Sequence, residues 1–124
     1  MRNKEQIIRA YFKSWIKQDI SVIKNNFAEN IIYSECYGPI YRNKSEVLKW
    51  FKDWNQNGKV LLWNIKQIIL AQSKAVVEWH FKCNDQSKIS EFDGVSLITF
   101  NKQNQIIEVK EFQSDSKHYF PYSE

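Results

Sequence analysis

The residues of this chain that could do chemistry are few, and the most promising are carboxylates placed within alternating, strand-like runs. Glu111 shares a strand parity with Ile107 and Val109, although neither face of that strand is cleanly polar. A carboxyl group held among apolar neighbours has a raised pKa and can act as a general acid or base. We therefore expect acid/base chemistry on a small molecule.

Other chemistry-bearing patterns are missing from the sequence. His80 and His118 are far apart, and Cys36 and Cys83 lack the spacing of metal ligands. The three glycines stand alone, so there is no phosphate-binding loop, and no Gly-x-Ser-x-Gly nucleophile motif occurs. We therefore expect neither a metal ion nor a cofactor.

The two histidines favour different interpretations. His80 lies beside Glu78 on the polar side of a strand-like run, which is typical of a surface or dimer-interface residue. His118 belongs to the aromatic tail 118–122, which could fold over a pocket as a lid or pack across a partner copy. His118 is therefore a candidate ligand-binding or acid/base residue.

Helical periodicity dominates the first half of the chain. It predicts helices over residues 4–18, 20–25 and 45–54. Asp19 is expected to cap the second helix, and Gly58 is expected to end the third in a left-handed conformation.

Alternating patterns then predict a sheet. The strands are expected over residues 30–37, 59–71, 75–84, 90–101 and 105–114. The connections 71–74 and 101–104 are short enough for antiparallel hairpins, whereas 84–89 is predicted to be a longer polar loop. This order of elements predicts a single α+β domain over residues 1–124.

Composition limits the classes of partner. Aromatic residues make up 15% of the chain and include five tryptophans, enough for a core and a ring-lined cavity. The net charge is +4, but the basic residues are scattered, so we expect no nucleic-acid partner. The sequence contains no membrane-spanning run and no signal-peptide pattern, which predicts a cytoplasmic protein with reduced thiols and no membrane contact.

Several segments resemble the NTF2-like superfamily, which includes ketosteroid isomerases, polyketide cyclases and limonene epoxide hydrolases. The resemblance is carried by 27–30, 33–35, the helix 45–54, and 92–100 with Glu111-Phe112, and it is nearest to the SnoaL-like branch. It implies a cystatin-like cone, in which three N-terminal helices pack on a curved, mostly antiparallel sheet around a hydrophobic pocket. The mixed polarity of the last strand also predicts a homodimer through the outer sheet face.

The resemblance also implies roles for individual residues. Tyr11 stands where the isomerases carry an oxyanion donor, and Glu35 stands where they carry the general base. Ser96 replaces the second, acidic donor, so ketosteroid isomerisation itself is not expected. The alternatives are a core tyrosine with a satisfied hydroxyl and a glutamate that only hydrogen-bonds a ligand or the backbone.

By the same alignment, Glu111 replaces a small apolar pocket residue and would face Glu35. Mutual repulsion and desolvation would keep at least one of these carboxyls protonated near neutrality, giving a base and an acid in one pocket. The alternative for Glu111 is a structural carboxylate. The resemblance places aromatic residues at the pocket, although core packing is the alternative: Trp15, Tyr33, Trp50, Trp54, Trp63 and Trp79.

We therefore predict a SnoaL-like protein that binds a small, partly apolar organic molecule. The leading hypothesis is a cofactor-independent isomerase, cyclase or dehydratase-like enzyme that uses Glu35 as base and Glu111 as acid or orienter, with Tyr11 and Ser96 as polar anchors. The alternatives are a non-catalytic ligand-binding protein and a dimeric interaction module that uses the outer sheet face.

Overall fold

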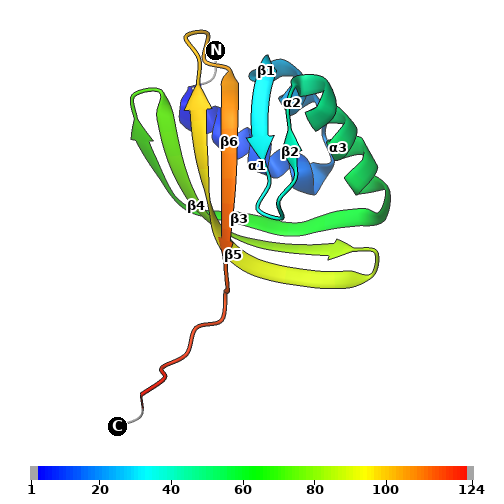
Figure 1. The fold of residues 1–124 in the computed structure, drawn as a ribbon, viewed down its shortest axis with the longest axis vertical. Coiled ribbons are helices and arrows are strands. Elements are labelled where there is room, and N and C mark those ends of the chain that lie inside the picture. The colour runs from blue at the N-terminus through cyan, green and yellow to red at the C-terminus, as the bar shows by residue number, and fades with distance from the viewer. Residues whose placement is uncertain (1–2, 123–124) are drawn as a thin grey trace.

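The computed structural model describes residues 3–122, and within them the chain forms three helices and six strands (Figure 1). In chain order the elements are α1 (Lys4–Lys17), α2 (Ser21–Asn26), β1 (Phe27–Ser34), β2 (Ile40–Tyr41), α3 (Lys44–Asn57), β3 (Gly58–Ala71), β4 (Lys74–Asp85), β5 (Lys88–Phe100) and β6 (Ile106–Ser114). None of the helices in this part of the chain is long and apolar enough to cross a membrane.

The strands form one mostly antiparallel sheet with the order β2-β1-β6-β5-β4-β3. β1 and β6 are the one parallel pair in this sheet. They are its first and last strands in chain order, and they lie side by side near the centre of the sheet. β3 has register shifts between Val60 and Leu62 and between Ile65 and Gln67. Such bulges increase bending and twist, and β3, β4 and β5 curve strongly around the helices (Figure 1). The fold is therefore α+β, as the sequence predicts.

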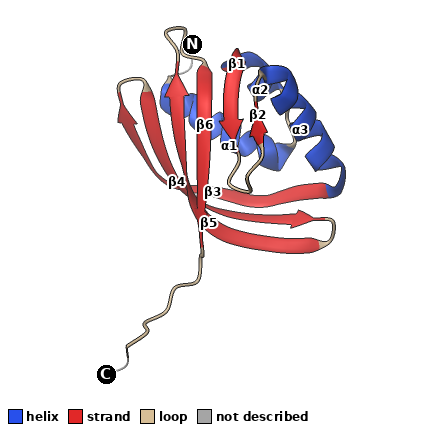
Figure 2. Ribbon diagram, in the orientation of Figure 1, coloured by secondary structure: helices blue, strands red, loops and turns tan. Residues whose placement is uncertain are grey.

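Helix α1 is the main element that closes the curved sheet. Asn3 caps it with a capping box, because the Asn3 side chain accepts from the Gln6 N–H and the Gln6 side chain accepts from the Asn3 N–H. Its buried stripe includes Ile8, Tyr11 and Trp15, and the helix packs across β3. Figure 2 shows α1 crossing behind the sheet, with α2 and α3 at the β1 side.

The alternation along the central strands matches the predicted parity. On β4 the dry face carries Val77, Trp79 and Cys83, while His80 faces the other way. On β5 the same face carries the buried residues Phe92, Gly94, Ser96, Ile98 and Phe100. The inner face of the curved sheet is therefore apolar, whereas the outer face carries polar and exposed apolar side chains together.

Two predicted turns are wrong in detail. The 84–89 segment is no loop, because β4 and β5 continue to Asp85 and from Lys88 around a two-residue turn. Both turn residues, Gln86 and Ser87, have positive φ (53° and 68°), as a type I′ hairpin turn needs. Gly58 is extended (φ −124°), because the chain passes directly from α3 into β3.

The first strand also differs from its prediction. It begins at Phe27 and ends at Ser34, three residues earlier at each end than expected, and the two-residue strand β2 pairs with it. Asp19 does accept from the N–H of Ser21 at 3.0 Å, although the residue at the N-cap position is Ile20. The main consequence is that Glu35 lies just beyond the strand end, in a tight loop.

Candidate functional site

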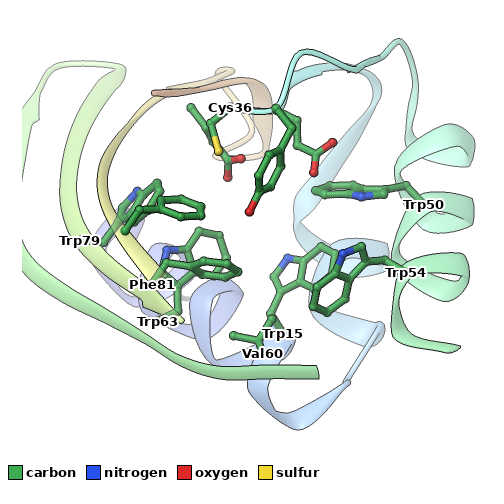
Figure 3. A pocket seen from close by; sticks show the side chains of 12 residues that line it. Trp15, Cys36, Trp50, Trp54, Val60, Trp63, Trp79 and Phe81 are labelled. Carbon is green, nitrogen blue, oxygen red and sulfur yellow. The ribbon is translucent and has the colours of Figure 1, made fainter. Parts of the chain in front are cut away.

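An aromatic cavity lies inside the curve of the sheet, between the sheet and helices α1 and α3. It has a volume of about 50 Å³. Its lining comes from seven parts of the chain and comprises Trp15, Glu35, Cys36, Tyr37, Trp50, Trp54, Val60, Trp63, Trp79, Phe81, Phe92 and Glu111. Figure 3 shows the labelled rings around the hollow, with Cys36 on the side opposite Trp63 and Trp15. We call this space the inner cavity.

Glu111 ends a chain of hydrogen bonds that starts on α1. The Trp15 indole N–H donates to the Tyr11 hydroxyl (2.9 Å), and the Tyr11 hydroxyl donates to that of Tyr33 (2.7 Å). The Tyr33 hydroxyl then donates to Glu111 Oε2 (2.5 Å). Each hydroxyl accepts one bond and donates one, so every donor in the relay is directed towards the carboxyl of Glu111.

The environment of Glu111 favours its protonated form. Burial raises its pKa to about 8, and the nearby Glu35 charge acts in the same direction. The hydrogen bond from Tyr33 opposes this effect, as does a backbone hydrogen bond from Cys36. Near neutral pH, Glu111 is therefore mainly a carboxylic acid that can donate a proton into the inner cavity.

Glu35 is the second carboxyl on the wall of the inner cavity. Burial raises its pKa, and the Tyr41 hydroxyl, which donates to Glu35 Oε2 at 3.0 Å, lowers it. The Glu35 N–H donates to the Pro39 carbonyl (2.9 Å), which holds the loop after β1 in place. Glu35 has fewer donors and more solvent than Glu111, so the two carboxyls have unequal environments.

A wider cleft opens beyond the inner cavity. Its volume is about 500 Å³, and it shares Glu35, Tyr37, Trp50 and Trp54 with the inner cavity. The rest of its lining comes from β2, α3 and the β4–β5 hairpin: Tyr41, Asp53, Asn57, Cys83, Asp85, Gln86, Lys88 and Ser90. We call this space the outer cleft. Its shared lining makes it continuous with the inner cavity.

The structure places the predicted site residues at different depths. All five tryptophans line the inner cavity together with Glu35 and Glu111. Tyr11 and Tyr33 lie one layer behind the wall, where they are 1% and 0% exposed and act on Glu111 through hydrogen bonds. Burial raises the pKa of both phenols well above the usual value. They therefore position Glu111 rather than line the cavity.

Two predicted residues lie away from the inner cavity. Ser96 is 1% exposed, and its hydroxyl accepts from the Trp79 indole N–H at 2.9 Å, so it holds a wall residue in place. His118 is exposed in the tail that follows β6. That tail runs outward from the body of the protein and does not cover the cavity (Figure 1).

Several lining residues were not predicted from the sequence. Phe81 and Phe92 lie on the strand parities that the sequence marks as dry, so that signal was available. Cys36 and Tyr37 lie in the loop after β1, within the range 30–37 that the sequence pattern assigns to a strand. Burial raises the pKa of the Cys36 thiol to about 12, so this thiol is protonated and a poor nucleophile.

His80 belongs to the opposite face of the sheet. Its Nδ1 lies 2.6 Å from Asp93 Oδ1, and its Nε2 lies 2.7 Å from Glu91 Oε2. Lys66 pairs with Asp93 at 3.3 Å. Among residues 3–122, no group of three or more His, Cys, Asp or Glu side chains is arranged to hold a metal ion.

Comparison with known proteins identifies the family and the fold. The family model described as a SnoaL-like domain matches residues 8–109. A hypothetical protein with a ketosteroid isomerase-like fold from Catenulispora acidiphila, solved in complex with trimethylamine, is 13% identical, with a TM-score of 0.77 over 87% of this chain and 85% of that one.

Two further solved structures have the same fold. A Xanthomonas campestris protein of unknown function with a cystatin-like fold is 14% identical (TM-score 0.76, 92% of both chains). An LEH-like epoxide hydrolase from M. tuberculosis is 8% identical (TM-score 0.80, 90% of this chain and 82% of that one). None of the curated proteins matches the chain in sequence.

Proposed function

The chain belongs to the SnoaL-like domain family, and we propose that it is a cofactor-independent acid/base enzyme acting on a small, partly apolar organic substrate. The observation that carries this proposal is the carboxyl pair on the wall of one aromatic cavity, with Glu111 at the end of the Trp15–Tyr11–Tyr33 relay. Isomerisation, cyclisation and dehydration each need a base and an acid that face the same substrate.

The unequal environments of the carboxyls assign the two roles. Glu35 is nearer to solvent and is the proton acceptor, which removes a proton from the carbon beside a carbonyl group. Glu111, with its pKa of about 8, is protonated near neutrality and donates its proton to the carbonyl oxygen. The products of this step are an enol, a Glu35 carboxylic acid and a Glu111 carboxylate, so protons and charge balance. Transfer of the proton from Glu35 to another carbon, with return of the enol O–H proton to Glu111, completes an isomerisation and restores both carboxyls.

The hydroxyl relay favours this step. As Glu111 loses its proton, the hydrogen bond from Tyr33 becomes charge-assisted and strengthens, and Tyr11 supports Tyr33 from behind. The aromatic walls exclude water and strengthen these electrostatic interactions. Tyr11 and Tyr33 are therefore positioning residues in this mechanism, while Glu35 and Glu111 are the catalytic residues.

The experiment that tests the proposal is proton exchange with solvent deuterium. A panel of small ketones and enones is incubated with the protein in D₂O, and deuterium at the carbon beside the carbonyl is followed by NMR. We expect exchange with the wild type and a loss of about 100-fold or more in Glu35→Gln. Glu5→Gln, an exposed change on α1 with the same loss of charge, serves as the control.

The alternative is a non-catalytic ligand-binding protein. It is favoured by the separation of Ser96 from the cavity, since this position supplies no second oxyanion donor to a substrate. Compounds that bind in the inner cavity of the wild type, Glu35→Gln and Glu111→Gln alike, with no deuterium exchange in any of them, would support that alternative. The trimethylamine complex of the Catenulispora acidiphila neighbour is compatible with either version of a small-ligand pocket.

We also propose that two copies of the chain pair through the outer sheet face. A row of apolar residues crosses that face at Ile69, Val76 and Leu97, with Phe112 in the adjacent row. These side chains are 36–54% exposed. Light scattering should give twice the monomer mass for the wild type and the monomer mass for Phe112→Glu, and a monomeric wild type would contradict the proposal.

A further inference from the structure

The inner cavity combines two features that seldom occur together. Eight of its twelve lining residues are aromatic, and two of the remaining four are carboxyls. No Lys, Arg or His side chain among the described residues lines it. A neutral apolar ligand would explain the rings, but it would leave the negative charge of the carboxyl pair without a cationic partner on the cavity wall, which is unfavourable.

The rings are arranged as walls of a box rather than as a flat stack. Trp15 meets Trp54 at 81° and Trp50 at 54°, and on the opposite side Trp63 meets Trp79 at 84°. Figure 3 shows these indoles on both sides of the hollow. Rings inclined in this way present π surface from several directions, and π faces attract cations, with Trp the strongest of the side chains.

The outer cleft has the same electrostatic character. Glu35, Asp53 and Asp85 line the outer cleft, with Lys88 as its one cationic side chain among the described residues. Asp53 pairs with Lys49 at 3.2 Å, while Glu35 and Asp85 take part in no ion pair within residues 3–122. Since the whole chain carries a net charge of +4, an acidic cleft is a local reversal, and such reversals steer ions of opposite charge.

We propose that the inner cavity and the adjoining outer cleft receive a small organic cation, whose alkylated ammonium group lies against the tryptophan rings that the two spaces share. This inference rests on the proposed function, because it names the substrate class of the same site. The inner cavity, of about 50 Å³, is continuous in its lining with the outer cleft, of about 500 Å³, and the two together give room for a small organic cation. The cation supplies the positive charge that the carboxyl pair lacks.

The charges also balance with the acid/base roles. Burial raises the pKa of Glu111 to about 8, so near neutral pH this carboxyl is mainly protonated, and Glu35 is the carboxyl whose charge a bound cation would offset. The titratable groups that face Glu111 are Tyr33, Tyr11, Glu35 and Cys36, and both phenols and the thiol remain uncharged in this range. Cation affinity should therefore weaken as acid protonates Glu35.

The test compares choline with 3,3-dimethylbutan-1-ol, which has the same shape and no charge. Binding is measured by calorimetry and tryptophan fluorescence at pH 5 and pH 7. We expect choline to bind on the order of tenfold more tightly than the alcohol at pH 7. This preference should shrink at pH 5, while the alcohol should bind equally at both pH values.

Substitutions at Glu35 and Trp50 separate the electrostatic and the aromatic contributions to the preference for choline over the alcohol. Glu35→Gln should remove most of it, and Trp50→Leu should reduce it several-fold. Glu5→Gln and Phe112→Leu, which change an exposed charge and an exposed ring away from the cavity, should preserve it. Thermal unfolding of each variant checks that it is folded.

Equal or tighter binding of the alcohol would overturn the cation proposal, and so would binding of neither probe at millimolar concentration. Both outcomes leave the proposed function to be judged by deuterium exchange on neutral ketones. Conversely, tight choline binding that is lost in Glu35→Gln, with no exchange on any compound, would support the cation site and contradict the enzyme.

Discussion

The two faces of the paired strands β4 and β5 both carry hydrogen-bonded side chains, but in opposite environments. On the inner face, Trp79 donates to the buried Ser96 hydroxyl at 2.9 Å. One residue further along β4, His80 lies on the outer face between Asp93 and Glu91. Both faces are hydrogen-bonded, but only the inner one excludes water.

The carboxyls of the two faces show what that difference means. Glu111, behind aromatic walls, has its pKa raised to about 8 by burial. Asp93 has its pKa lowered, chiefly by its hydrogen bond with His80 and also by Lys66. A carboxyl without a cationic neighbour in a dry site keeps its proton and can do acid/base work, whereas one paired with cations near water is a structural anion.

The largest expected effect on stability comes from adding a side chain at Gly94, on the inner face of the sheet. A Cβ on Gly94 would clash with the Trp79 ring and would lie 2.5 Å from the backbone oxygen of Phe112. Gly94→Ala should therefore lower the free energy of unfolding by about 3 kcal/mol in urea denaturation.

Gly38→Ala is the matched control for that change. Its Cβ would meet nothing within 4 Å, but its φ of +114° disfavours alanine, so the cost should be about 1 kcal/mol. Equal costs at the two glycines would show that Trp79 does not pack against Gly94 as described.

The next effect is the pH dependence of stability set by Glu111. Its folded pKa is raised above the usual 4.5, so the folded state holds more protons than the unfolded state between these values. Wild-type stability should therefore fall between about pH 4.5 and 8, by about 2 kcal/mol once the shift is discounted for the partial exposure of Glu111. Glu111→Gln should flatten this part of the curve, and an unchanged slope would contradict a protonated Glu111.

A smaller effect should follow from cutting the relay at Tyr33. Its hydroxyl lowers the pKa of Glu111, so Tyr33→Phe should raise that pKa further above 8. The expected displacement corresponds to about 1–2 kcal/mol, the strength of a hydrogen bond to a charged group. NMR titration of the Glu111 carboxyl carbon measures it, with Tyr41→Phe as a control that should mainly affect Glu35.

The smallest effect belongs to the outer face. The pKa of His80 is raised by hydrogen bonds with Asp93 and Glu91, so its contribution is present below about pH 6.5 and is lost as pH rises through the raised value. His80→Gln should therefore lower stability by about 1 kcal/mol or less at pH 6 and by nothing at pH 9. A larger effect at pH 9 than at pH 6 would contradict this assignment, as urea denaturation at the two pH values can show.

Prediction from sequence worked best where periodicity is strong and local. The helix that carries Tyr11 and Trp15 shows a clear apolar stripe, and the alternation around Trp79 and Phe92 marks the dry face of the sheet. It failed at the ends of elements. The residues 84–89 are polar, which suggested a loop, yet backbone pairing between β4 and β5 extends through them.

The α+β fold class, the buried and exposed faces of the strands, and the presence of acids among apolar residues can be inferred from the sequence, because they depend on side-chain period and composition. Which groups meet depends on the three-dimensional arrangement of the elements. Trp15, Tyr11, Tyr33 and Glu111 come from three elements, and the parallel pairing of β1 with β6 brings the last two together. Hydrogen bonds and pKa values depend on such long-range contacts, which no local pattern encodes.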